Sequence, residues 1–72
     1  MDWTPHITST ADVLRGKPRL VGTRIPVSLV LGYLAEGRTA DEIAEELPDV
    51  TAEHVTACLA YARSLADFEV AA

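Results

Sequence analysis

Cysteine is almost absent from this sequence of 72 residues, which contains only Cys58. One cysteine cannot form a disulfide within the chain, and the residues near it do not supply a set of metal ligands. Both absences are typical of proteins from reducing compartments. We therefore expect a cytoplasmic protein with neither a metal nor a cofactor.

Long apolar runs and a basic leader are missing as well. The apolar run VLGYLA at residues 30–35 is far shorter than the roughly 20 residues that a bilayer-spanning helix needs. The N-terminal stretch MDWTPHITST has neither the basic nor the apolar part of a signal peptide. We expect a soluble, unprocessed protein that does not contact a membrane.

Aromatic residues make up only 6% of a chain that is 49% hydrophobic. The core must therefore be built from Leu, Val, Ile and Ala, which is more typical of packed helices than of a β-sandwich. A chain of this length forms one small domain, and such a core is only marginally stable alone. Without disulfide or metal support, we expect self-association into a homodimer.

Positive charge is scarce and unevenly distributed. The chain has six Lys and Arg residues against eleven Asp and Glu residues, for a net charge of −5. Four of the cations lie in RGKPRLVGTR at residues 15–24, whereas residues 36–72 hold nine of the carboxylates. We interpret the two halves as surfaces for different partners; the alternative is that the acidic half only keeps two helices in solution.

The first part of the chain favours short extended structure. Ile7-Thr8 predicts a strand, and Thr10 is a candidate N-cap for one helical turn, ADVLR, that Gly16 would end. β-branched residues then alternate over residues 21–27, which predicts a second strand with a bulge or turn at Gly22. Two prolines keep that strand short or at an edge because they lack N–H donors.

From Ser28 the apolar spacing changes to that of helices. The pattern predicts a helix that Gly37 ends, a second helix after Thr39 and a third after Thr51. Thr39 and Glu42 form a capping-box pattern, and a proline stops the second helix. The third helix is expected to bury one stripe: Val55, Cys58, Leu59, Ala62 and Leu65.

Together these elements predict a mainly α fold. Two capped helices joined by a tight turn are typical of a helix-turn-helix, so we expect a homeodomain-like or winged three-helix core with a short N-terminal β-strand or hairpin. Residues 1–26 would form the strand and basic arm and residues 27–72 the helix-turn-helix part of one structural domain. Many helix trios bind no DNA, so a plain helical core is the alternative.

The candidate DNA contacts come from the basic segment and the third helix. Cations on an extended segment can hold phosphates, and polar side chains on the second helix of the motif can reach base edges. The expected contacts are Arg15, Lys17, Arg19, Thr23, Arg24, Thr51, His54 and Thr56. Pairing of Arg19 or Arg24 with acidic helices, in this chain or a neighbour, is the competing expectation.

No catalytic site is predicted. His54 and Cys58 lie four residues apart on one helix but lack a third partner, and Cys58 fits the apolar stripe. The adjacent Glu45 and Glu46 diverge on a helix and form no acid–base pair. An enzyme is therefore the weakest hypothesis.

The string GKPRLVGTRIPVSLVLGYLAEGRTADEIAEELPDVTAEHVTACLAYA, residues 16–62, resembles family 433 of the domains of unknown function (DUF433). The family's motifs occur here in order. They are Gly16-Lys17-Pro18, Gly22-Thr23-Arg24-Ile25-Pro26-Val27, Glu36-Gly37, Glu42-Ile43-Ala44, Pro48 with Val50-Thr51, Glu53 with Val55, and Tyr61-Ala62. The family is similar to antitoxins of VapB type.

This resemblance implies a dimeric DNA-binding autorepressor that also binds and neutralises a PIN-like ribonuclease toxin. Because the motif runs nearly to the last residue, we expect a toxin-wrapping tail to be short or absent. The alternative function is a protein-interaction module without DNA binding, whose acidic helices cover a basic partner. The expected partner contacts are Glu45, Glu46, Asp49 and Phe68.

Two parts of the chain are candidates for the dimer interface. We favour strand exchange around Ile7 and residues 20–25, because a short edge strand is poorly stable unless it is paired. The third helix is the other candidate.

Overall fold

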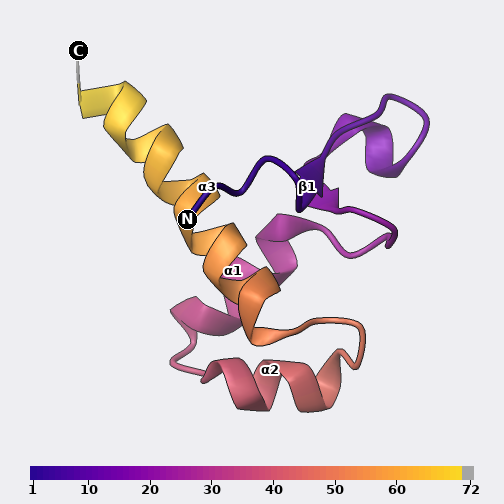
Figure 1. Cartoon of the computed structure of the whole chain (residues 1–72), viewed down its shortest axis with the longest axis vertical. Coiled ribbons are helices and arrows are strands. Elements are labelled where there is room, and N and C mark those ends of the chain that lie inside the picture. Colours follow the sequence, from indigo (N-terminus) through magenta and orange to yellow (C-terminus); the bar gives the residue numbers. More distant parts are fainter. Residues whose placement is uncertain (71–72) are drawn as a thin grey trace.

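The computed structural model describes residues 1–70, with side chains described as far as Asp67. Its elements are, in order, β1 (Ile7–Thr8), η1 (Leu14–Gly16), β2 (Arg19–Leu20), α1 (Val27–Ala35), α2 (Ala40–Glu46) and α3 (Ala52–Val70). Figure 1 shows the hairpin and α2 at different ends, with α3 crossing α1 between them. The predicted class, mainly helical with a short N-terminal hairpin, is confirmed. No helix in the described part of the chain is long and apolar enough to cross a membrane.

β1 and β2 form an antiparallel pair in which Ile7 lies opposite Leu20 and Thr8 opposite Arg19. On its other side, β2 meets the segment that leads into α1, where an isolated bridge joins Arg19 to Pro26. Both sides of β2 are therefore paired within the chain. β2 therefore has no unpaired edge left for the strand exchange that we favour from the sequence.

The second strand is shorter than the alternation of β-branched residues predicts. Gly22 has a φ of +79°, and Thr23 N donates to Leu20 O at 3.1 Å, so the chain turns directly after β2. The Thr23 hydroxyl fastens this turn by donating to Leu20 O at 2.8 Å and accepting from Ile25 N at 3.0 Å. The turn at Gly22 is confirmed, whereas a strand continuing to Val27 is wrong because the turn interrupts the ladder.

Between the strands the chain makes a left-handed turn. Leu14, Arg15 and Gly16 have φ angles of +51°, +56° and +82°, and Val13 rather than Thr10 is the N-cap of this segment. The prediction of one ordinary helical turn capped by Thr10 is wrong. Neither Leu nor Arg favours this conformation by itself, so the tertiary pairing of the flanking strands must hold it.

The ends of α1 and α2 follow their local signals. Gly37 adopts a φ of +88° and donates its N–H to Leu34 O at 2.9 Å, which ends α1 as predicted. Thr39 N donates to Glu42 Oε1 at 2.9 Å, and Glu42 N donates to Thr39 Oγ1 at 3.2 Å. The predicted capping box is confirmed.

α3 begins with a similar reciprocal cap. His54 N donates to Thr51 Oγ1 at 3.2 Å, and Thr51 N donates to His54 Nδ1 at 3.0 Å. The imidazole here takes the place that Glu or Gln has in a capping box. The predicted N-cap role of Thr51 is confirmed.

One hydrophobic core joins the hairpin to the helices. Trp3 covers one side of it by meeting Tyr61 edge to face, with ring centroids 4.8 Å apart. Ile7 and Leu20 lie in the same core as the helices, so residues 1–26 pack together with the helical part. The buried members are Ile7, Leu20, Val27, Val30, Ile43, Val50, Val55, Ala57 and Cys58.

α3 buries only part of its predicted stripe. Val55 and Cys58 are buried, but Leu59 and Leu65 are 50% and 51% exposed. Ala57, which the predicted stripe omits, is fully buried instead. The predictions for Leu59 and Leu65 are wrong because the N-terminal segment and the core cover a different arc of the helix.

Replacing Thr39 by Ala removes the hydroxyl that caps α2. We expect T39A to lower the free energy of unfolding by about 1 kcal/mol, the usual cost of losing such a cap. Urea unfolding followed by circular dichroism measures the change. The control is Thr56→Ala, whose hydroxyl bonds to Ala52 O inside α3, where loss of a β-branched residue is neutral or slightly stabilising. Equal losses in both variants would contradict the role of the cap.

Candidate nucleic-acid interface

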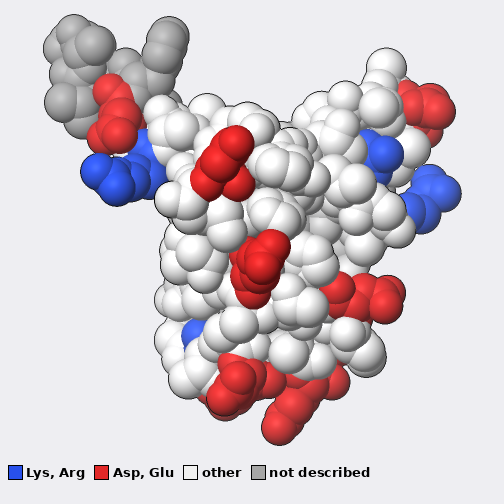
Figure 2. All heavy atoms as spheres, viewed as in Figure 1, with Lys and Arg blue, Asp and Glu red and all other residues white. Residues whose placement is uncertain are grey.

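Figure 2 shows Asp and Glu side chains crowding the end formed by α2, while Lys and Arg side chains project at the hairpin end beside an acidic neighbour. Arg15, Lys17 and Arg24 are exposed. Among residues with described side chains, no carboxylate lies within ion-pair distance of these cations or of Arg19. The ion pairs among the described side chains are His6–Glu53, Arg38–Glu46 and Arg63–Asp67. The expected pairing of Arg19 or Arg24 with acidic helices of the same chain does not occur among them.

Arg19 and Thr23 brace the hairpin. The half-buried Arg19 donates from Nη1 to Thr10 Oγ1 at 3.1 Å and from Nε to Thr23 O at 3.1 Å. The Thr23 hydroxyl fastens the adjoining turn. Hydrogen-bonding groups of both side chains are therefore already occupied within the hairpin. We expect both residues to contact phosphates less strongly than their exposed neighbours do.

Arg15 and Lys17 lie close together at the left-handed turn. They line one surface depression with Leu14 and Pro26. A left-handed conformation costs a residue other than glycine about 1–2 kcal/mol, and here both Leu14 and Arg15 adopt it. Strain of this kind gathers at functional sites, and local propensity in the sequence contains no signal for it.

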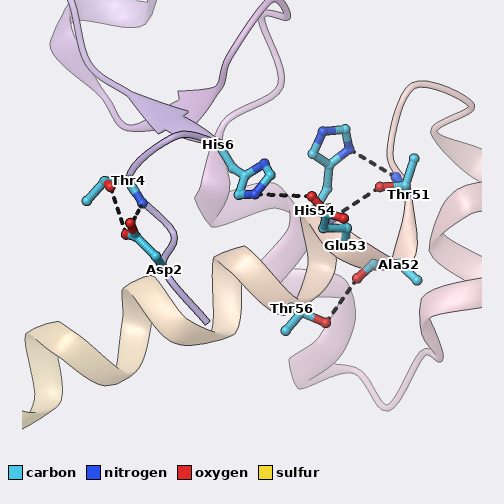
Figure 3. A network of polar contacts seen from close by, with 8 residues as sticks. All are labelled: Asp2, Thr4, His6, Thr51, Ala52, Glu53, His54 and Thr56. Atoms are coloured by element: carbon cyan, nitrogen blue, oxygen red, sulfur yellow. Dashed lines mark hydrogen bonds and ion pairs between the residues drawn. The ribbon is translucent and has the colours of Figure 1, made fainter.

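The predicted contacts at the start of α3 are divided between capping and surface roles (Figure 3). Thr51 and His54 bond to each other's backbone N–H groups. The exposed Thr56 donates its hydroxyl hydrogen to Ala52 O at 3.1 Å and keeps acceptor capacity for another group. Of the three, Thr56 is the one whose side chain is not part of the helix cap.

The N-terminal segment runs along α3, a contact outside the expectations from the sequence. His6 Nε2 lies 3.2 Å from Glu53 Oε1, and the His6 and His54 rings meet edge to face with centroids 6.3 Å apart. Figure 3 shows His6 reaching the first turn of α3 from the strand side. No sequence pattern links these residues, because Glu53 lies 47 positions after His6.

The outward face of α3 opens on a groove of about 450 Å³ whose far wall is formed by Met1 and Trp3. Thr56, Leu59 and Arg63 line it from the helix side. Arg63 is thus a further cation on α3 that the predicted set omits. Its spacing of seven residues from Thr56 is a signal that could have found it.

Lys17 lies on a different side of α3. It lines a separate groove between α1 and α3, together with Tyr61 and Leu65. Leu65 is two residues beyond Arg63, which corresponds to about 200° of rotation around the helix. Lys17 therefore lies on a different side of the molecule from the outward face of α3.

The acidic end contains both unpaired and paired carboxylates. Glu45 and Asp49 are exposed, and neither takes part in an ion pair among the described side chains. Glu46 pairs with Arg38, whose guanidinium lies 4.9 Å from the centroid of the Tyr33 ring. Hydrogen bonds from Arg38 and then Tyr33 hold the pKa of Glu46 below its usual range. Glu46 is therefore less available to a partner than Glu45 or Asp49.

Cys58 is fully buried, and the prediction that it belongs to the core is confirmed. Desolvation raises the pKa of its thiol to about 11, so the thiolate is not the ground state near neutral pH. Among the described residues, no three His, Cys, Asp or Glu side chains come together as metal ligands.

The sequence matches the family described as "Protein of unknown function (DUF433)" over residues 7–62. This range covers more than half of the chain and runs from β1 into α3. The chain belongs to the DUF433 family. The region common to DUF433 therefore includes the hairpin, α1, α2 and the exposed cations between β1 and α1.

A curated relative of this DUF433 chain is "Uncharacterized protein y4eO" from Sinorhizobium fredii (strain NBRC 101917 / NGR234). The two are 34% identical over 58 residues, which cover 81% of this chain and 26% of the relative. The chain thus spans about a quarter of that relative's length, and a similar segment occurs there within a longer protein. No solved structure matches this chain.

In this DUF433 protein, Glu46→Gln should reduce the sensitivity of the fold to acid. The folded-state pKa of Glu46 lies below its unfolded value of 4.5, so its carboxylate stabilises the fold above that pH and the contribution is lost as pH falls through the folded-state pKa. The wild type should therefore lose more stability than E46Q between about pH 6 and pH 3. Urea unfolding at both pH values measures this.

The control for this experiment is Glu45→Gln. It removes a neighbouring carboxylate that takes part in no ion pair among the described side chains, so E45Q should follow the wild type. Identical acid sensitivity of E46Q and the wild type would show that the Arg38–Glu46 pair contributes nothing.

Proposed function

We propose that this chain is a homodimeric, cytoplasmic DNA-binding regulator of antitoxin type, which represses its own operator and neutralises a PIN-like ribonuclease toxin. In this proposal α2, the turn through Pro48 and Asp49, and α3 form the helix-turn-helix, and α1 supports it. Within the described chain a short hairpin precedes the three helices of this homeodomain-like or winged core.

The observation that carries the DNA-binding part is the state of Arg15, Lys17 and Arg24. All three are exposed, and no described carboxylate pairs with them, although the chain has a net charge of −5. Cations that served only stability would be expected to pair with the many carboxylates. These three cations have no carboxylate partner among the described residues. They are therefore available to DNA phosphates, which bind Lys and Arg with release of counterions.

Base contacts in this proposal come from the outward face of α3. Arg63 can bond to guanine, Thr56 can accept or donate at a base edge, and Leu59 can meet a thymine methyl group. Thr51 and His54 hold the start of this helix, so their contribution is to position it. Lys17 lies on a different side of the molecule from the outward face of α3. The basic end therefore contacts the DNA backbone beside the major groove rather than the same base pairs.

The acidic end supports the toxin-binding part of the proposal. Glu45 and Asp49 are exposed and suit the basic surroundings of a ribonuclease active site. The other expected anchor, Phe68, lies outside the described side chains. The second candidate function, a protein-interaction module without DNA binding, is favoured by the seven carboxylates between residues 36 and 53.

Arg15→Gly separates binding from folding at the basic end. Glycine adopts positive φ without penalty, so R15G should keep or slightly raise the free energy of unfolding. Its affinity for DNA upstream of its own gene should fall, and the log–log salt slope of the dimer should shrink by about 2 because each protomer loses one phosphate contact. A salt series of fluorescence anisotropy titrations measures both quantities.

The control for R15G is Arg38→Gln, which removes one positive charge from the acidic end and should leave the salt slope unchanged. If wild-type protein binds its upstream DNA no more tightly than random duplex, the repressor part of the proposal is lost.

Glu45→Gln combined with Asp49→Asn tests the acidic end. When the chain is co-expressed with the product of the adjacent gene, the double variant should recover much less of that product than the wild type does. Asp12→Asn, an exposed carboxylate elsewhere, is the control and should recover it fully. If the wild-type chain elutes without the product of the adjacent gene, the toxin-binding part of the proposal is wrong and only the DNA-binding part stands.

A further inference from the structure

Two imidazoles meet at the start of α3 and use their ring nitrogens in different ways. His54 Nδ1 accepts a hydrogen bond from Thr51 N at 3.0 Å, whereas His6 Nε2 lies 3.2 Å from Glu53 Oε1. The two rings meet edge to face with centroids 6.3 Å apart, and both are half-buried (Figure 3). The cap of α3 therefore lies beside the contact that ties the N-terminal segment to the same helix.

The cap requires the neutral form of His54. An imidazole nitrogen accepts a hydrogen bond only while it carries no proton, and a protonated ring has donors at both nitrogens. Protonation therefore removes the acceptor of Thr51 N. It also places a positive charge at the N-terminal end of a helix, where the macrodipole favours negative charge. The bond from His54 N to Thr51 Oγ1 can persist, so the first turn is loosened rather than lost.

The contact of His6 responds to a proton in the opposite sense. A protonated His6 forms a charge-assisted hydrogen bond with the Glu53 carboxylate, which is stronger than a bond from the neutral ring. The Glu53 side chain is 65% exposed, so this gain is small. Asp2, the other carboxylate of the N-terminal segment in Figure 3, is bonded to Thr4. Among the described side chains, only Glu53 lies within ion-pair distance of either ring.

We propose that His54 is a pH-sensitive cap: acidification through the imidazole range loosens the first turn of α3, while His6 and Glu53 hold the N-terminal segment more tightly to the same helix. Histidine is the side chain whose ordinary titration falls between pH 5 and pH 8. The device is a property of the fold and does not depend on DNA binding.

The cap of α2 provides an internal comparison. It has the same reciprocal geometry, but Glu42 takes the place that His54 has in α3. The hydrogen bond from Thr39 N holds the pKa of Glu42 below 4.5, so this cap stays charged and intact throughout the imidazole range. Of the two caps, only that of α3 therefore responds to pH near neutrality.

Urea unfolding of the full chain at pH 8 and pH 5.5 tests the cap, with His54→Gln as the variant. Glutamine fits a capping box and accepts from the N-cap N–H without titrating. His6→Gln serves as the common background, because it removes the opposing response. Neutral His54 stabilises the fold, and this contribution is lost as pH falls. Between pH 8 and pH 5.5, the unfolding equilibrium constant should therefore rise about three- to fivefold more in H6Q than in H6Q/H54Q.

Carboxylates stay largely ionised at both pH values and are common to all variants, so they cancel in this comparison. The response of His6 has the opposite sign. On lowering the pH, the unfolding constant of H54Q should rise less, or fall more, than that of H6Q/H54Q. An equal response of these two variants would overturn the part of the proposal that concerns His6.

Nitrogen-15 spectra of the imidazole rings give a second measurement that does not depend on stability. At pH 8 His54 should carry its proton on Nε2, since Nδ1 accepts from Thr51 N. An Nδ1–H tautomer of His54 at pH 8, or equal pH responses of H6Q and H6Q/H54Q, would overturn the cap. Neither measurement involves DNA, so both outcomes are independent of the proposed function.

Discussion

The burial of Ile7 and Leu20 against the helices is the constraint on which the rest of the structure depends. These two residues face each other across the hairpin, and both belong to a core of few members. Burying such a side chain contributes roughly 1.5–3 kcal/mol, which a domain this small cannot forgo. Because both strands are anchored, the residues between them must leave the core as a loop, and that loop carries Arg15 and Lys17.

The same anchoring separates the two signs of charge. Pro18 O accepts from Val27 N at 2.9 Å, which ties the hairpin to the first turn of α1. Arg15, Lys17 and Arg24 thus stay with the hairpin segments, while the carboxylates of α2 lie at another end of the molecule (Figure 2). In a chain with so few cations, this separation is what leaves Arg15, Lys17 and Arg24 without carboxylate partners among the described residues.

The N-terminal segment decides which faces of α3 remain open. Trp3 packs on Tyr61 and His6 pairs with Glu53, so this segment lies beside the helix and forms a wall of the groove on its outward face. The second groove lies on the side toward α1, where Leu65 is exposed. One helix therefore presents two faces, and the proposed function assigns the outward one to DNA.

Sequence alone determined the end of α1, the starts of α2 and α3, the mainly helical class and the burial of Cys58. The caps at Gly37, Thr39 and Thr51 depend on contacts between residues three positions apart, so residue type and spacing are enough to predict them. The helical class follows in the same way from apolar periodicity.

Only the tertiary structure decided the length of β2, the hand of the turn at Arg15, the exposure of Leu59 and Leu65, and the contact of His6 with Glu53. Each of these depends on segments that are distant in the sequence. Periodicity states that a helix has an apolar arc, but the chain that packs against it determines which part of that arc is covered.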